Sequence, residues 1–172
     1  MGEKVVLETQ RLYLREMTDQ DFGVLFEVLS DPETMRYYPT PYTEEKVRYW
    51  IDRFCESYVK NGFGLWIVVE KETGVVVGDC GLILQSLEGV DEVEIGYHFN
   101  KKYWGRGYAT EAAAGCRQYA FEELGLKRVI SLIRPENKPS WRVAERNGMK
   151  IERELIWWEL KHRVYVSERG EV

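Results

Sequence analysis

The sequence has few of the residues that build metal centres or disulfide frameworks. Among its 172 residues are three cysteines, Cys55, Cys80 and Cys116, and no two of them form a C-x-x-C pair. The two histidines lie far apart in the chain, so no cluster of metal ligands is visible. An odd, scattered set of cysteines is typical of reduced thiols in the cytoplasm. We therefore expect no metal and a cytoplasmic location.

Long apolar runs are missing as well. No run approaches the roughly 20 residues that a membrane-spanning helix needs. The opening MGEKVVLETQ lacks the apolar segment of a signal peptide, and Val6 stands where myristoylation needs Ser or Thr. The net charge of −5 argues against nucleic acid or an anionic membrane as a partner. It suits a cationic acceptor such as an amine, although solubility accounts for it equally well.

Length and apolar content favour one packed domain. A chain of 172 residues with 44% hydrophobic and 13% aromatic residues can bury a substantial core. No repeat, linker or low-complexity segment divides it, so we expect a single domain over residues 1–172.

Apolar periodicity and turn residues predict the order β-α-α-β-β-β-α-β-α-β-β. This is a mixed α/β (α+β) sheet of about seven strands, with about four helices on both faces. Strands are expected near residues 11–15, 64–70, 75–84, 93–99, 128–134, 149–158 and 163–167. Helices are expected near residues 18–29, 43–61, 108–124 and 139–146.

The most informative stretch runs from residue 92 to residue 115. Alternation through Phe99 predicts a half-buried strand, and helical spacing begins at Tyr108. The turn between them contains glycines. Unpaired N–H groups and the helix dipole make such a helix start an anion site, and glycine allows close approach. Lys101, Lys102 and Arg106 add positive charge. A plain β–α turn that needs two glycines is an equally good interpretation of the spacing.

Two common nucleotide motifs do not match this turn. The P-loop needs four residues between its glycines and a following Lys-Ser/Thr, which Gly105-Arg106-Gly107 does not offer. The dinucleotide fingerprint needs a small residue where Thr110 stands and an acid at the end of a second strand, where Arg134 stands. Both motifs are therefore excluded.

The run Lys102-Tyr103-Trp104-Gly105-Arg106-Gly107-Tyr108-Ala109 resembles the Q/R-x-x-G-x-G/A signature of the GNAT (Gcn5-related) N-acetyltransferase superfamily, with Lys in the first position. Residues 7–15, LETQRLYLR, are similar to the opening of the branch that acetylates ribosomal-protein N-termini. Asn137-Lys138-Pro139-Ser140 and Glu145-Arg146-Asn147-Gly148-Met149 resemble later elements of that family. The resemblance covers the whole chain.

The resemblance implies the GNAT fold, in which two central strands splay apart, and acetyl-CoA as the co-substrate. The turn would hold the diphosphate, the central strand would pair with the pantetheine arm, and the N–H of Phe99 would polarise the thioester oxygen. Asn137 would contact the pantetheine, with a helix N-cap as its other interpretation. The implied cofactor-binding residues are Tyr97, His98, Phe99, Lys102, Trp104, Gly105, Arg106, Gly107, Tyr108, Ala109, Asn137 and Ser140.

The implied reaction is direct attack of a primary amine on acetyl-CoA, which needs a general base. The candidate bases are Glu94, Glu159 and His98, although Glu94 would also suit a solvated sheet position and His98 a structural one. Many family members protonate the leaving sulfur with a tyrosine where this chain has Ala144. We therefore assign that role to Ser140, which would equally suit the first turn of a helix.

Aromatic residues are the candidates for the acceptor site. Tyr37, Tyr38 and Trp157 are predicted to bind the acceptor, and Trp50 and Trp158 are further candidates, although aromatics at helical spacing more often belong to the core. The branch resemblance implies a protein N-terminal α-amine. A small amine (a polyamine or an antibiotic) and a non-catalytic CoA-binding module remain alternatives. The partners are then acetyl-CoA and an amine, without nucleic acid or membrane, for a monomer or homodimer.

Overall fold

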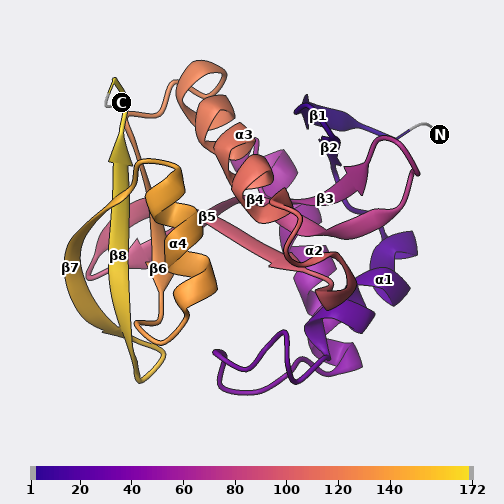
Figure 1. Ribbon diagram of the computed structural model, residues 1–172, viewed down its shortest axis with the longest axis horizontal. Coiled ribbons are helices and arrows are strands. Elements are labelled where there is room, and N and C mark those ends of the chain that lie inside the picture. Colours follow the sequence, from indigo (N-terminus) through magenta and orange to yellow (C-terminus); the bar gives the residue numbers. More distant parts are fainter. Residues whose placement is uncertain (1–2, 171–172) are drawn as a thin grey trace.

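A computed structural model describes residues 3–170, which form one mixed sheet with helices on both faces (Figure 1). The sheet order is β1-β2-β3-β4-β5-β6-β8-β7. Its strands are β1 (Val5–Glu8), β2 (Leu12–Arg15), β3 (Leu65–Glu70), β4 (Val76–Leu87), β5 (Val90–Phe99), β6 (Arg128–Ile133), β7 (Lys150–Trp157) and β8 (Leu160–Glu168). The helices are η1 (Asp19–Asp21), α1 (Phe22–Leu29), α2 (Glu44–Asn61), η2 (Lys101–Tyr103), α3 (Tyr108–Glu122) and α4 (Lys138–Arg146).

The mixed sheet and the four α-helices confirm the predicted fold class, with one strand more than expected. The additional strand is β1, an edge strand of four residues that pairs only with β2 and has a register shift between Val5 and Leu7. So short and irregular a strand leaves little periodicity in the sequence.

Local sequence signals explain where the helices begin and end. Thr18 and Asp21 form a capping box around η1, and Thr43 caps α2 by accepting from the N–H of Lys46. Gly62 ends α2 at φ 81°, a conformation that favours glycine. The start of α3 differs, because its N-cap, Gly107, has no side chain to satisfy the free N–H groups.

The central strands splay apart, as predicted. β5 pairs antiparallel with β4 along its whole length, but it pairs with β6, in parallel, only at Glu94 and Ile130. Side chains replace the missing ladder bonds just beyond this point. The Ser131 hydroxyl donates to the Ile95 carbonyl (2.9 Å), and the Leu132 N–H donates to the Glu94 carboxylate (3.2 Å). Beyond Ile95, the edge of β5 that faces β6 is therefore open.

Apolar side chains fill both sides of the sheet. One core cluster packs α3 against β2, β3 and β4, and a second packs α1 and α2 against the opposite face. The opening between β5 and β6 separates the part of the sheet from β1 to β5 from the unit of β6, β7, β8 and α4 (Figure 1). Within residues 3–170, no helix is both long and apolar enough to cross a membrane.

Candidate active site

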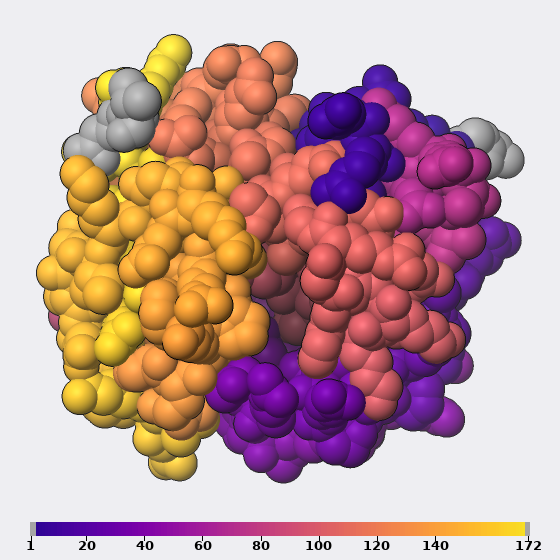
Figure 2. All heavy atoms as spheres, in the orientation of Figure 1, coloured from indigo at the N-terminus to yellow at the C-terminus, as the bar shows by residue number. Residues whose placement is uncertain are grey.

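A cleft of about 830 Å³ crosses the molecule where β5 and β6 diverge. Its walls come from the loop around residues 33–42, from β5, from the start of α3, from α4 and from the turn between β7 and β8. Figure 2 shows the surface hollowed between the orange C-terminal part, the segment near residue 100 and the purple loop below it. One end of the cleft is the α3 start, and the other is the aromatic loop.

The α3 end of the cleft presents unpaired backbone donors. No N–H group of residues 105–110 has a hydrogen-bond acceptor among residues 3–170. Gly105 and Gly107 hold φ angles of 78° and 80°, which shape the turn. Free N–H groups at a helix start, together with the helix dipole, attract anions. This end of the cleft therefore fits a diphosphate.

Arg11, the residue just before β2, holds this turn in place. Its Nε donates to Glu111 (2.7 Å), and its Nη1 donates to the Arg106 carbonyl (2.8 Å). Its guanidinium also lies 4.6 Å from the centre of the Tyr108 ring. Arg11 belongs to the stretch that resembles the ribosomal-protein branch. In the structure, this stretch therefore helps to fix the turn at the start of α3.

The positively charged side chains predicted near the diphosphate have partners within the protein. Lys101 pairs with Asp31, and Lys102 pairs with Glu27 (2.9 Å) on the surface. Arg106 stacks over Tyr103, and neither Lys102 nor Arg106 lines the cleft. These side chains therefore have other partners in this structure, and their binding of the diphosphate stays a prediction.

Two arginines of α4 lie near this end of the cleft. Arg142 and Arg146 line the cleft together with the α3 start. Asn147, just after α4, donates to the Thr110 carbonyl (3.4 Å) and so joins the two helices at this end. Arg142 and Arg146 are four residues apart, so both lie on one face of α4. That spacing was the available signal, but the sequence alone did not show which face turns toward the cleft.

The open edge of β5 can accept an extended ligand. The N–H of Asn100 bonds to the Val77 carbonyl, and hydrogen bonding alternates along an antiparallel pair. The backbone groups of Tyr97 and Phe99 consequently face the opening, whereas those of His98 face β4. The Phe99 carbonyl already accepts a hydrogen bond from the Trp104 indole (2.8 Å). The Phe99 N–H is therefore the group that remains for a ligand in the opening.

Asn137 and Ser140 lie at the start of α4. The Asn137 side chain caps α4 by accepting from the Ser140 N–H (3.3 Å), so its N-cap interpretation is confirmed. The Ser140 hydroxyl lies 2.8 Å from the Tyr97 hydroxyl, and both residues line the cleft. Burial raises the pKa of Tyr97, which keeps it a neutral hydroxyl. Ala144 is buried in the core, so α4 offers no tyrosine there.

Glu94 lies on the wall of the cleft that faces the aromatic loop. It accepts hydrogen bonds from Gln85 (3.0 Å) and from the Leu132 N–H. Burial raises the pKa of its carboxyl, and these hydrogen bonds oppose that shift. Arg53 also lines the cleft. Glu94 is thus a half-buried carboxyl group at the splay, hydrogen-bonded to Gln85 and Leu132 and open to the cleft.

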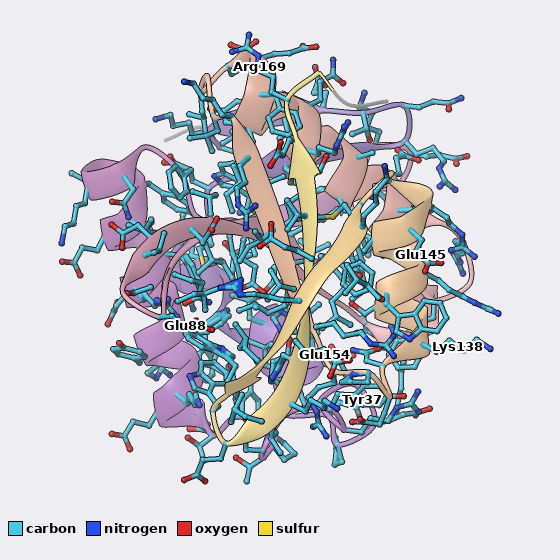
Figure 3. The ribbon with its side chains drawn as sticks, turned by 90° about the vertical axis from the view of Figure 1, so that its left-hand side faces the viewer. Tyr37, Glu88, Lys138, Glu145, Glu154 and Arg169 are labelled. Atoms are coloured by element: carbon cyan, nitrogen blue, oxygen red, sulfur yellow. The ribbon has the colours of Figure 1, made fainter. Side chains whose placement is uncertain are left out.

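The predicted acceptor residues Tyr37, Tyr38 and Trp157 line the cleft, as do Trp50 and Trp158. Arg134 donates to the Tyr37 carbonyl (3.2 Å), which joins the aromatic loop to the end of β6. In the side view of Figure 3, Tyr37 lies near the end of α4 that carries Lys138. The predicted base Glu159 is exposed on the β7–β8 turn and does not line the cleft.

A hydrogen-bonded chain that the sequence analysis missed runs from the half-buried Tyr38 in the cleft wall to two buried residues. The Tyr38 hydroxyl lies 2.7 Å from His98 Nε2, and His98 Nδ1 lies 2.9 Å from Asp79 Oδ1. His98 is therefore a side-chain neighbour of the acceptor end. No group of three or more potential metal ligands occurs in the part of the chain from residue 3 to residue 170.

Comparison with known proteins agrees with this geometry. Residues 11–150 match the acetyltransferase (GNAT) domain family. Protein YkkB of Bacillus subtilis is 39% identical over 166 residues, 96% of each chain, and N-acetyltransferase p20 of Bacillus licheniformis is 33% identical over 150 residues, 86% of this chain and 83% of p20. A GNAT-family acetyltransferase structure from Bacillus anthracis is similar with a TM-score of 0.81 and 29% identity, covering 96% of this chain and 99% of the other. The chain belongs to the GNAT acetyltransferase family.

Proposed function

We propose that this protein transfers the acetyl group of acetyl-CoA to a primary amine by direct attack, and that the amine is a protein N-terminal α-amine. The observation that carries the proposal is the cleft itself, which runs from the free N–H groups at the start of α3, along the open edge of β5, to Glu94 and the aromatic loop. A diphosphate-bearing thioester and an amine can therefore meet at the splay.

The residues divide the reaction between the two sides of β5. On the α3 side, the N–H groups of residues 105–110 and the guanidiniums of Arg142 and Arg146 bind the phosphates. The N–H of Phe99 stabilises the oxyanion that forms on the thioester carbonyl. The Ser140 hydroxyl, backed by Tyr97, gives a proton to the departing thiolate.

On the other side, Glu94 takes a proton from the attacking amine. An α-amine with a pKa near ~8 is mostly protonated at neutral pH, so a nearby proton acceptor is needed. The raised pKa of Glu94 strengthens the carboxylate as a base, and its charge attracts an ammonium group.

Two features support a peptide N-terminus as the acceptor. The first is the stretch of residues 7–15, which resembles the opening of the branch that acetylates ribosomal-protein N-termini. The acceptor end of the cleft is also open and aromatic, with Trp158 half exposed at its rim. Flat aromatic walls suit the start of an extended peptide, whose α-amine can reach Glu94.

The test is thiol release on mixing acetyl-CoA with a panel of amines. The panel contains hexapeptides with different N-terminal residues, each with an N-terminally blocked copy as its control, together with spermidine and an aminoglycoside. We expect the unblocked peptides to be acetylated fastest. Faster turnover of spermidine or the aminoglycoside would assign a small-amine acceptor, and CoA binding without turnover of any amine would indicate a non-catalytic module.

A further inference from the structure

Tyr38, His98 and Asp79 form a hydrogen-bonded chain that the proposed reaction has not used. They come from three separate elements: the loop after α1, β5 and β4. The distances are 2.7 Å from the Tyr38 hydroxyl to His98 Nε2 and 2.9 Å from His98 Nδ1 to Asp79 Oδ1. Tyr38 and His98 line the acceptor side of the cleft, and Asp79 lies behind them.

Asp79 is the unusual member of this chain. Its side chain is wholly buried, and its Oδ2 has no hydrogen-bond partner within residues 3–170. In the same part of the chain, His98 is the only basic group within 4 Å of its carboxylate. A lone buried carboxylate is costly, and a proton on the neighbouring imidazole offsets that cost. Asp79 therefore orients the His98 ring, turns Nε2 toward Tyr38, and lies where it can stabilise a positive charge that forms on the imidazole.

Tyr38 connects His98 to the cleft. Burial raises the pKa of Tyr38 well above its usual value, and the charges of Asp79 and Glu94 act in the same direction. Tyr38 is therefore a neutral hydroxyl that passes a proton on rather than a tyrosinate that stores one. Tyr42 and Tyr97 also act to raise the pKa of Tyr38. Arg53 of α2 acts on Tyr42 and lines the same cleft.

We propose that Tyr38, His98 and Asp79 form a relay that takes a proton from the acceptor amine, an inference that rests on the proposed function. An ammonium ion that becomes an amide loses two protons while its N–C bond forms and the C–S bond of the thioester breaks. One proton passes to the Tyr38 oxygen as the Tyr38 hydroxyl gives its own proton to His98 Nε2.

The remaining proton movements balance the reaction. The other amine proton goes to Glu94, and the thiolate takes a proton from Ser140. After the product leaves, His98 and Glu94 release their protons to water, and water restores Ser140. Tyr38 contacts the amine and is a catalytic residue, whereas Asp79 acts through His98 and is a positioning residue. This arrangement selects acceptors that arrive protonated.

The test uses Tyr38→Phe and His98→Gln, with Tyr42→Phe as the matched control. Tyr42 lies in the same loop and packs edge-on against Tyr38, but its hydroxyl has no partner among residues 3–170. Two acceptors are compared: a hexapeptide with an N-terminal serine and the same peptide with an N-terminal aminooxy group. The aminooxy nitrogen is uncharged (–O–NH2) at neutral pH, so it loses one proton on acylation where the ammonium loses two.

We expect Tyr38→Phe and His98→Gln each to lower kcat with the amine peptide about 100-fold, the usual contribution of a general base, and by no more than about threefold with the aminooxy peptide. The double variant should be no slower than the slower single variant, because the two residues act as a unit. Asp79→Asn should show the same dependence on the acceptor, and Tyr42→Phe should match the wild type.

Equal losses with both acceptors, or variants as fast as Tyr42→Phe, would overturn the relay. Near-ultraviolet circular dichroism and CoA affinity, measured on each variant, separate a folding defect from a catalytic one, and Tyr38→Phe keeps the test valid if His98→Gln does not fold. If the wild type acetylates the peptide and the variants match it, only the relay is wrong. If the wild type acetylates no amine, the proposed function is wrong as well.

Discussion

Replacing Gly107 by alanine puts a Cβ on a residue held at φ 80° at the start of α3. The left-handed conformation costs an ordinary L-residue about 1–2 kcal/mol. The new Cβ meets nothing closer than Arg11 Nη2 at 3.4 Å, so the cost comes from the backbone and not from a clash. For a chain of this length, that loss corresponds to a fall in Tm of about 2–8 °C.

The same change should weaken CoA binding. Relief of the strain turns the N–H groups of residues 105–110 away from the anion, and each charge-assisted hydrogen bond lost costs about 1.5–3 kcal/mol. The loss of one such bond raises Kd about tenfold or more. Gly107→Val should weaken binding further, because its larger side chain also obstructs the approach of the phosphates. The assays are thermal denaturation and isothermal titration calorimetry with CoA.

Gly62→Ala is the matched control. Gly62 has φ 81°, no atom lies within 4 Å of an added Cβ, and it ends α2 rather than lining the cleft. It should lose the same stability and keep the wild-type Kd for CoA. An unchanged Kd in Gly107→Ala, or an equal rise in both variants, would refute the reasoning that the turn at Gly107 holds the phosphates.

Three further predictions concern the rest of the cleft. Arg142→Ala and Arg146→Ala should each raise the Kd for CoA about tenfold in calorimetry, as expected for the loss of one charged hydrogen bond. Lys102→Ala should keep a Kd close to that of the wild type. The reverse result would show that Lys102, and not the two arginines, binds the phosphates. Arg11→Ala should raise the KM for acetyl-CoA with little change in kcat, since Arg11 holds the turn without lining the cleft, and a fall in kcat alone would contradict this in steady-state kinetics. Glu94→Gln should lower kcat about 100-fold at constant CoA affinity. Because burial raises the pKa of Glu94, wild-type activity should fall as the pH drops through that raised pKa. If Glu94→Gln shows the same fall at acid pH, another residue is the base.

Much of the fold was predictable because its elements follow local rules. Alternation along the central strand, helical spacing after Tyr108 and the caps at Thr43 and Gly62 lie within short stretches of sequence. β1 was missed because four irregular edge residues have too weak a period. The glycine turn was predictable for the same reason, since a helix start with free N–H groups is a local feature.

The site was predictable only where one element forms it. Lys102 is predicted to bind phosphate, and no local pattern showed that it pairs with Glu27, 75 residues away in sequence. Tyr38 and His98 are separated by 60 residues, and His98 and Asp79 by 19, so no local pattern announces their hydrogen bonds. Long-range packing also decided that Glu94 faces the cleft and that Glu159 does not.

The central claim is that acetyl-CoA lies with its diphosphate over the start of α3 and its pantetheine arm along the open edge of β5. A crystal structure of the protein with CoA tests it most directly. The account predicts phosphate oxygens within hydrogen-bonding distance of the N–H groups of residues 105–110, and the pantetheine paired with the backbone of Tyr97 and Phe99. A diphosphate bound elsewhere, with only water at the start of α3, would contradict it.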